Sequence, residues 1–382
     1  MLQRRFAFRR RCSTFTTIAA SNSYVSAMFA YSSSLPFRRT LQILLLSAAI
    51  SLSCLVLLRE SHSLPYLHLF SFSTFSDTPP LSSPYFASSL GDVDEPSSEA
   101  DEYGLERVLK DAATEDRTII LTTLNEAWAS PSSVIDLFLE SFRIGNHTRQ
   151  LLNHLVIIAL DKKAFIRCLA VHIHCFALVT EGVDFHLEAY FMTPDYLKMM
   201  WRRIDFLRTV LEMGYNFVFT DADVMWFRDP FPIFDMDADF QIACDHYLGI
   251  PEDLDNRPNG GFAFVKSNNR SIEFYKYWYS SRETYPGYHD QDVLNKIKYD
   301  PLIDDIGLKF RFLDTAYFGG FCEPSKDLNL VITMHANCCI GMNSKLHDLR
   351  IMIEDWKQFM SLPPYVKSSS ILSWRVPQNC SI

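Results

Sequence analysis

Two carboxylates one residue apart, Asp221 and Asp223, follow directly on an apolar run in the segment FVFTDADVMWF, residues 217–227. Residues i and i+2 of an extended chain point the same way, so both carboxylates can reach one point just beyond a strand end. Oxygen ligands at such a point suit a hard divalent cation such as Mn²⁺ or Mg²⁺. The pattern predicts a metal site. The alternative is a pair of loop carboxylates that cap the next element.

A second group of polar residues lies in RPNGGFAFVKSN, residues 257–268, where Asn259 precedes two glycines that open a predicted strand. Gly260 and Gly261 let the backbone approach a ligand closely, and Asn259 can hydrogen-bond sugar hydroxyls. The alternative for this segment is an ordinary turn.

A third group lies in YHDQDVLNKI, residues 288–297, where a helix is predicted to begin. An anionic site near the metal would stabilise an oxocarbenium-like centre, and we favour a functional role at this site for Asp292 or Gln291. Asp290 fits this role and helix capping equally well.

The fourth group lies in VITMHANCCIGMNSKLHDL, residues 331–349. His335 ends an apolar run and can supply an imidazole ligand to the same metal. Ten residues later, Lys345 can approach a diphosphate as a point charge. A single histidine at a strand end is more often structural, and the other three segments are what favour metal ligation here.

The elements that must position these residues alternate between short apolar runs and longer amphipathic runs. Predicted strands cover residues 117–124, 154–161, 216–223, 239–245, 260–267, 308–314 and 329–336, and predicted helices cover 132–144, 163–172, 193–214, 271–282, 291–298 and 349–360. This alternation predicts an α/β fold with a mixed, mostly parallel sheet flanked by helices. In such sheets, ligands bind beyond the carboxyl ends of the strands.

The N-terminal part has a different composition. Residues 1–59 contain eight Arg and no acidic residue, although the whole chain carries a net charge of −9. We expect a cytosolic basic tail (1–39), a transmembrane signal anchor (40–58), a Ser/Pro-rich stem (59–114), the main domain (115–362) and a C-terminal tail (363–382). A cleaved signal peptide and an organelle transit peptide are the alternatives to the anchor.

Charge and cysteine content limit the partners further. The acidic chain argues against a nucleic-acid binder that neutralises phosphates. Seven of the nine cysteines follow the predicted anchor, where an oxidising lumen allows disulfides. Because seven is odd, at least one is free or pairs between chains, and the sequence does not assign the pairs.

The four segments together resemble the nucleotide-diphospho-sugar transferase domain of plant glycosyltransferase family 77, over roughly residues 115–360. The resemblance is carried by TTLNEAW (122–128), FTDADVMWFRDP (219–230), RPNGGFAFVKSN (257–268), HDQDVLN (289–295) and MHANCCIG (334–341). It implies a GT-A fold of Rossmann-like type, a UDP-sugar donor, dependence on Mn²⁺ and retention of anomeric configuration. It also implies Golgi residence and a cell-wall glycan or glycoprotein acceptor, with arabinose, xylose or galactose as the transferred sugar.

The resemblance also implies roles for the first part of the site. Asp221, Asp223 and His335 would bind the metal, and Asp221 would also contact the donor ribose. Thr123 and Asn125, at the end of the first predicted strand, would lie near the nucleotide base.

At the sugar end, the resemblance implies that Asn259 and Gly260 line the pocket and that Gln291 and Asp292 lie near the anomeric carbon. The chain is thus expected to be a single-pass type II Golgi membrane glycosyltransferase, with the catalytic domain in the lumen and a homo- or hetero-oligomeric state left open.

Two other functions fit parts of the pattern. A phosphatase of the haloacid-dehalogenase type also places D-x-D after a strand, but it requires Thr or Val where Met225 stands. A non-catalytic lumenal protein would keep the same fold to bind sugar nucleotides or to assemble complexes. The intact metal positions argue against this alternative, but the sequence leaves it open.

Overall fold

The computed structural model describes residues 98–178, 180, 185, 191–369 and 372–380, which belong to one compact unit within Leu90–Ile382. The predicted basic tail, the predicted anchor at 40–58 and most of the predicted stem lie outside the described residues. Within the described ranges, none of the helices combines the length and the apolar character that crossing a bilayer requires.

The described elements largely follow the predicted alternation of strands and helices. The strands are β1 (Thr118–Leu124), β2 (Leu155–Ala159), β3 (Cys175–Ala177), β4 (Asn216–Thr220), β5 (Val224–Trp226), β6 (Phe240–His246), β7 (Arg257–Val265), β8 (Phe310–Phe312), β9 (Phe318–Gly320) and β10 (Thr333–His335). The helices are α2 (Ser98–Ala112), α3 (Glu126–Ala129), α4 (Val134–Ile144), α5 (Lys162–Val171), α6 (Pro194–Glu212), α7 (Asn269–Ser280), α8 (Asp290–Ile297), α9 (Pro301–Asp305), α10 (Met342–Ser361) and α11 (Pro364–Ser369).

A seven-stranded sheet forms the centre, in the order β3-β2-β1-β4-β7-β6-β8, and a small sheet β5-β10-β9 lies beside it. The pairs among β3, β2, β1 and β4 are parallel, as is β6 with β8, whereas β7 runs antiparallel to both of its neighbours. The predicted mixed, mostly parallel sheet is confirmed. Because β7 reverses direction between them, β4 and β6 run the same way and end at the same edge.

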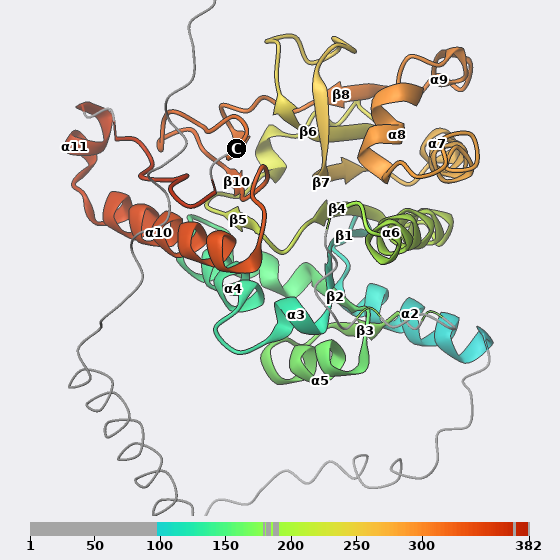
Figure 1. The fold of residues 1–382 in the computed structure, drawn as a ribbon, viewed down its shortest axis with the longest axis horizontal. Helices are drawn as coiled ribbons and strands as arrows, with labels where there is room; N and C mark the ends of the chain where they lie inside the picture. The colour runs from blue at the N-terminus through green and yellow to red at the C-terminus, as the bar shows by residue number, and fades with distance from the viewer. Residues whose placement is uncertain (1–97, 179, 181–184, 186–190, 370–371, 381–382) are drawn as a thin grey trace, which may run out of the picture. The chain divides into compact units, whose positions relative to one another are not determined.

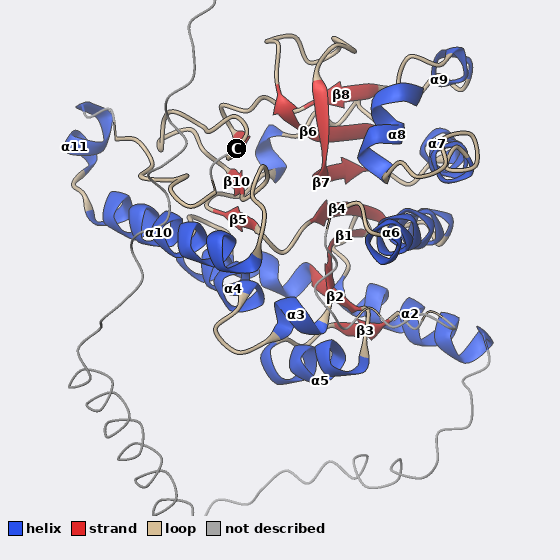
Figure 2. Ribbon diagram, in the orientation of Figure 1, coloured by secondary structure: helices blue, strands red, loops and turns tan. Residues whose placement is uncertain are grey.

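Helices cover both faces of the large sheet (Figures 1 and 2). One buried cluster joins α4 and α10 to the face that carries Ile120, Val218 and Phe262, and the other joins α2, α6 and α7 to the opposite face. Along β1, Ile119 and Leu121 belong to the second cluster while Ile120 belongs to the first. This alternation explains why the strands are apolar at nearly every position.

Two predicted boundaries differ from the structure. Helix α2 lies inside the segment assigned to the stem, and its Leu105 and Leu109 are buried in the core, so the folded domain begins before residue 115. Helix α10 begins at Met342, seven residues before the predicted start at Leu349. Gly341, with φ of +88°, makes the turn before it, and Lys345 therefore lies in the first turn of a helix.

Disulfides join Cys168 to Cys175, Cys322 to Cys338 and Cys339 to Cys380, and Cys244 is free and buried. The odd cysteine expected from the sequence is thus Cys244. The last bridge ties the C-terminal segment to the start of α10, and Val376 and Cys380 are buried. The segment around these two residues therefore packs on the domain.

Candidate active site

The two carboxylates lie in the turn between β4 and β5. Strand β4 ends at Thr220, and the N–H of Asp221 donates to the Gly261 carbonyl at 2.7 Å. The Val224 N–H then donates to the Asp221 carbonyl at 3.1 Å and closes the turn. His335 ends β10, which pairs with β5 in register His335↔Val224. Ligand atoms of Asp221, Asp223 and His335 consequently lie within 4.8 Å of one another.

The charges around Asp223 leave one oxygen suited to a cation. Lys345 forms an ion pair with Oδ2. The other oxygen, Oδ1, is buried and lies 3.2 Å from His335 Nε2, and no donor among the described residues reaches it with good hydrogen-bond geometry. An orphaned buried oxygen beside a ring nitrogen is the arrangement that a shared metal ion satisfies. Two carboxylates and one imidazole suit Mn²⁺ better than Mg²⁺, which prefers oxygen ligands and water.

The pKa values follow from burial and from these neighbours. Burial disfavours ionisation of Asp223, but the charges of Lys345 and His335 outweigh burial and lower its pKa. Burial also raises the pKa of Asp221, and the Arg203 guanidinium offsets this only in part. For His335, burial favours the neutral ring, yet the Asp223 carboxylate raises its pKa overall. The pKa values of two of the three ligands, Asp221 and His335, are therefore raised, and a cation would compete with protons for these two.

Gly261 makes the close approach of these ligands feasible. A Cβ at this position would lie 2.4 Å from His335 Cε1 and 2.8 Å from Asp221 Oδ2. Both distances are shorter than van der Waals contact, so only glycine fits here. At the adjacent Gly260, a Cβ would meet nothing nearer than an Arg203 nitrogen at 3.5 Å.

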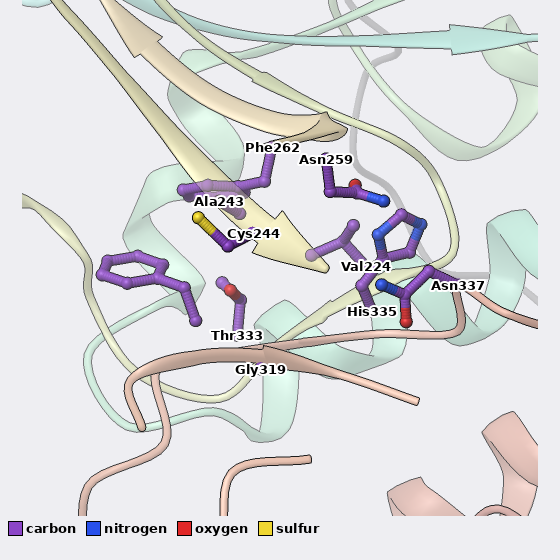
Figure 3. Close-up of a pocket in the computed structure, with 10 residues that line it drawn as sticks. Val224, Ala243, Cys244, Asn259, Phe262, Gly319, Thr333, His335 and Asn337 are labelled. Atoms are coloured by element: carbon purple, nitrogen blue, oxygen red, sulfur yellow. The ribbon is translucent and has the colours of Figure 1, made fainter. Parts of the chain in front are cut away.

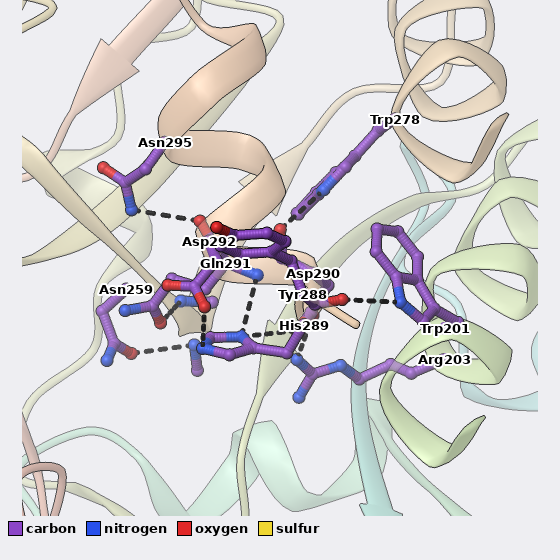
Figure 4. A network of polar contacts seen from close by, with 12 residues as sticks. Trp201, Arg203, Asn259, Trp278, Tyr288, His289, Asp290, Gln291, Asp292 and Asn295 are labelled. Atoms are coloured by element: carbon purple, nitrogen blue, oxygen red, sulfur yellow. Dashed lines mark hydrogen bonds and ion pairs between the residues drawn. The ribbon is translucent and has the colours of Figure 1, made fainter. Parts of the chain in front are cut away.

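A buried arginine of helix α6, which lies outside the four sequence segments, supports the site. Arg203 donates to Asp221 Oδ1 at 2.9 Å and to Asp290 Oδ2 at 2.5 Å, with its guanidinium 4.8 Å from the centre of the Phe219 ring. Figure 4 shows the Arg203 side chain reaching toward Asp290. The signal was available, because Arg203 occupies an apolar-face position between Met200 and Leu207.

A cavity of about 520 Å³ lies over this edge of the sheet. It is lined by nine of the ten predicted site residues, namely Thr123, Asn125, Asp221, Asp223, Asn259, Gly260, Gln291, His335 and Lys345. The tenth, Asp292, is not among the lining residues. Its side chain is 43 % exposed and lies 3.4 Å from His289 Nε2. Its neighbour Asp290 lines the cavity instead, and the N-cap of α8 is His289 rather than Asp290.

Asn125 and Thr123, the two residues predicted to lie near the nucleotide base, are also parts of the secondary structure. Asn125 caps α3 by accepting the Trp128 N–H at 3.2 Å, and it donates to the Phe185 carbonyl at 3.2 Å. Thr123 is the penultimate residue of β1. The ammonium of Lys345 lies 5.0 Å from the centre of the Trp128 ring, so this end of the cavity combines a cation with an aromatic wall.

A second hollow of only about 10 Å³ lies beneath the site. Figure 3 shows Asn259, His335 and Asn337 gathered at one end of it, with Ala243 and Cys244 farther away. Its volume matches about one water molecule, so the substrate space is the large cavity.

The chain is similar to several known proteins. Residues 150–349, just over half of the chain, match the family model of nucleotide-diphospho-sugar transferases. An uncharacterized protein of Arabidopsis thaliana is 54 % identical over 277 residues, covering 72 % of this chain and 73 % of that protein. A UDP-galactose:fucoside alpha-3-galactosyltransferase of Dictyostelium discoideum is 38 % identical over 68 residues, which are 17 % of this chain and 10 % of that protein. A solved glycosyltransferase involved in the glycosylation of the major capsid of PBCV-1 aligns with a TM-score of 0.36 and 14 % identity, over 61 % of this chain and 98 % of that one.

Proposed function

This chain belongs to the nucleotide-diphospho-sugar transferase family, and from that premise we propose that it is a metal-dependent glycosyltransferase that uses a UDP-sugar. The observation that carries the proposal is the convergence of Asp221, Asp223 and His335 within 4.8 Å at the wall of a cavity of about 520 Å³. Cavities of this size hold ligands as large as a sugar nucleotide.

The charges at this wall suit a diphosphate leaving group. A Mn²⁺ ion held by the two carboxylates and the imidazole would neutralise the negative charge that develops on the diphosphate. Lys345 adds a second cation beside Asp223, within reach of the same space. Arg203 forms an ion pair with Asp221 from the buried side. The position of the Asp221 carboxylate is therefore fixed before substrate binds. Such preorganised charges are the largest contribution to catalysis in many enzymes.

The sugar would lie toward Asn259, Gly260 and Gln291, which line the same cavity. We propose that the acceptor hydroxyl attacks from the face that the diphosphate leaves, with retention of configuration, as in plant glycosyltransferase family 77 and its GT-A fold. A pentose or galactose donor is part of the proposal. The name of the Dictyostelium relative, with its UDP-galactose donor, agrees with the galactose class.

We further propose a single-pass type II Golgi protein with the domain in the lumen, acting on cell-wall glycans or glycoproteins. The sequence supports this through its Arg-rich start, the apolar run 40–58 and the Ser/Pro-rich segment that follows. Three disulfides in the described part of the chain also support this proposal, because disulfides persist mainly in oxidising compartments.

Release of UDP from a set of UDP-sugars tests the proposal. The full-length protein in detergent is incubated with UDP-galactose, UDP-xylose or UDP-arabinose, with Mn²⁺ or with EDTA. Asp223→Asn removes a ligand charge at nearly constant shape and should lower UDP release by about 100-fold or more. Asp237→Asn changes an exposed carboxylate that does not line the cavity and should have no effect. Full turnover of Asp223→Asn in EDTA would refute the proposal.

A binding measurement separates the non-catalytic alternative. Calorimetric titration of the wild-type protein with UDP-sugar and Mn²⁺ should show binding together with turnover. Binding without release or transfer of sugar would identify a sugar-nucleotide-binding protein, and the absence of any nucleotide binding would contradict both functions.

A further inference from the structure

A carboxylate outside the four sequence segments lies among the amides of the proposed sugar end. Asp245 is half-buried at the carboxyl end of β6 and lines the large cavity. Its Oδ1 accepts from Asn259 Nδ2 and from Asn337 Nδ2, each at 2.8 Å. Its Oδ2 accepts from Gln291 Nε2, also at 2.8 Å. One carboxylate thus receives three amide N–H groups from three different segments.

The other end of each amide is fixed as well, because each amide oxygen accepts a backbone N–H. These bonds are Gly261 N–H to Asn259 Oδ1 (2.9 Å), Gly260 N–H to Gln291 Oε1 (2.9 Å) and Cys322 N–H to Asn337 Oδ1 (3.2 Å). A flip of any one amide would turn its NH₂ group toward a backbone N–H and its oxygen toward a carboxylate oxygen. The orientation of all three side chains is therefore determined at both ends.

A carboxylate fits this pattern, because both of its oxygens can accept and the three amide groups all donate to it. An asparagine at position 245 would offer one oxygen and one NH₂ group. If its oxygen served Asn259 and Asn337, its NH₂ group would face the NH₂ group of Gln291.

The network continues to the metal ligands. Asn259 holds the N–H of Gly261, and the carbonyl of Gly261 accepts the N–H of Asp221 at 2.7 Å. Gln291 lies at the start of α8 beside Asp290, which Arg203 joins to Asp221 (Figure 4). Asp245 is thus connected through hydrogen bonds to the carboxylate end of the site, which it does not itself contact.

We infer that Asp245 is a positioning residue that orients Asn259, Gln291 and Asn337 toward the sugar of the donor. Each amide group retains a second N–H with no partner among the described residues, so this wall of the cavity offers donors to the hydroxyl and ring oxygens of a sugar. The sugar assignment rests on the proposed function. The orientation of the amides does not.

A charge swap between positions 245 and 291 tests the inference in the full-length protein. Asp245→Asn places NH₂ against NH₂, and Gln291→Glu places two anionic oxygens 2.8 Å apart in the wild-type geometry. Each single variant should lower the thermal midpoint by about 4 °C. In the double variant, the amide introduced at position 245 can donate to the carboxylate introduced at position 291, whose other oxygen still accepts the Gly260 N–H. The midpoint of the double variant should return to within about 1 °C of wild type.

Binding measurements on the same proteins separate positioning from general stability. With Mn²⁺ present, Asp245→Asn should weaken calorimetric binding of UDP-galactose about tenfold, while UDP binding changes by less than about twofold. Asp237→Asn is the control and should change neither value. A double variant as unstable as the sum of the singles would overturn the inference, as would equal weakening of UDP and UDP-galactose. If wild type binds no UDP-galactose, the proposed donor is wrong, and the thermal comparison still decides the role of Asp245.

Discussion

At the scale of single residues, the site depends on how closely the ligands approach one backbone position. Gly261 lies between Asp221 and His335. Its carbonyl accepts the Asp221 N–H, and its Cα faces Cε1 of the His335 ring. Gly261→Ala would place a methyl group 2.4 Å from His335 Cε1, so one of the two ligands must move. We expect Mn²⁺ affinity, measured by calorimetry without nucleotide, to fall by about 10- to 100-fold.

The neighbouring glycine supplies the control for that variant. Gly260→Ala adds the same methyl group at ordinary contact distance, 3.5 Å from the nearest side-chain atom, and keeps the N–H that Gln291 accepts. Mn²⁺ affinity should be unchanged within about twofold. Equal loss in both variants would show that the effect comes from the backbone and not from the ligand geometry.

Lys345 is expected to weaken Mn²⁺ binding and to strengthen nucleotide binding. Its ammonium pairs with Asp223, so a cation that uses this carboxylate must compete with it, whereas a bound diphosphate would be attracted by it. Lys345→Met should therefore raise Mn²⁺ affinity in the absence of nucleotide by roughly tenfold and lower UDP affinity in its presence by a similar factor. Lys357→Met, at an exposed lysine of the same helix that pairs with Glu140, is the control. A fall in both affinities would contradict the competition.

The residues that could be predicted from sequence are those that end strands. Asp221, Asp223 and His335 follow or end apolar runs, and strand ends converge at one edge of the sheet. Arg203 was missed because a charged residue in an amphipathic helix is usually taken for a surface position. Asp245 was missed although it follows the apolar run of β6, since nothing local shows that three amides from distant segments meet it.

At the scale of elements, Asp239 joins strand β6 to helix α7. Its buried carboxylate accepts two bonds from Arg270, at 2.7 Å each, one from Asn268 at 2.9 Å and one from the Lys309 N–H at 3.0 Å. Burial alone would raise the pKa of Asp239, but the bonds led by Arg270 outweigh burial and lower it. The Asp239 carboxylate is therefore ionised near neutral pH, and its bonds to Arg270 and Asn268 are present there.

The sign of this shift predicts a pH dependence of stability. Because the folded pKa is below the unfolded value of about 3.9, Asp239 stabilises the fold above that pH, and the contribution is lost as the pH falls through the folded pKa. Asp239→Asn should lower the free energy of unfolding in urea by about 2 kcal/mol at pH 7 and by less at pH 3. Asp237→Asn, exposed two residues earlier, should show no such difference. A constant effect at both pH values would contradict the assignment.

Most elements could be predicted because their periodicity is strong, but their direction and ends could not. The apolar sequence of β7 predicts a buried strand but not its direction. Its antiparallel pairing is set by the path of the chain, in which β6 precedes β7 and pairs with it. The start of α10 was placed too late because Met342 and Lys345 follow a cysteine pair and a glycine, which favour a loop locally. The disulfides of Cys338 and Cys339 hold this turn in place, and their pairing is a property of the folded chain.

At the scale of the whole molecule, the charge division between the N-terminal segment and the rest still predicts a tail, an anchor and a stem. The tail, the anchor and most of the stem lie outside the described residues. The stem boundary is where the structure differs. Composition changes from Ser and Pro to a charged amphipathic pattern at about residue 98, with Leu105, Leu109 and Ala112 at helical spacing. That spacing could have predicted α2.

Helix α2 is expected to be required for full stability of the domain. Leu105 and Leu109 are 5 % and 0 % exposed and pack with the cluster of α6 and α7, while His154 Nδ1 lies 2.7 Å from the Ala112 carbonyl. A protein that begins at residue 115 exposes this surface and should lose about 4 kcal/mol of unfolding free energy in urea relative to one that begins at residue 90, at roughly 2 kcal/mol for each leucine. In the longer protein, Leu105→Ala with Leu109→Ala should reproduce most of this loss, whereas Lys110→Ala, on the exposed side of the helix, should not. Identical urea midpoints for the two lengths would place α2 outside the cooperative unit and return the domain boundary to residue 115.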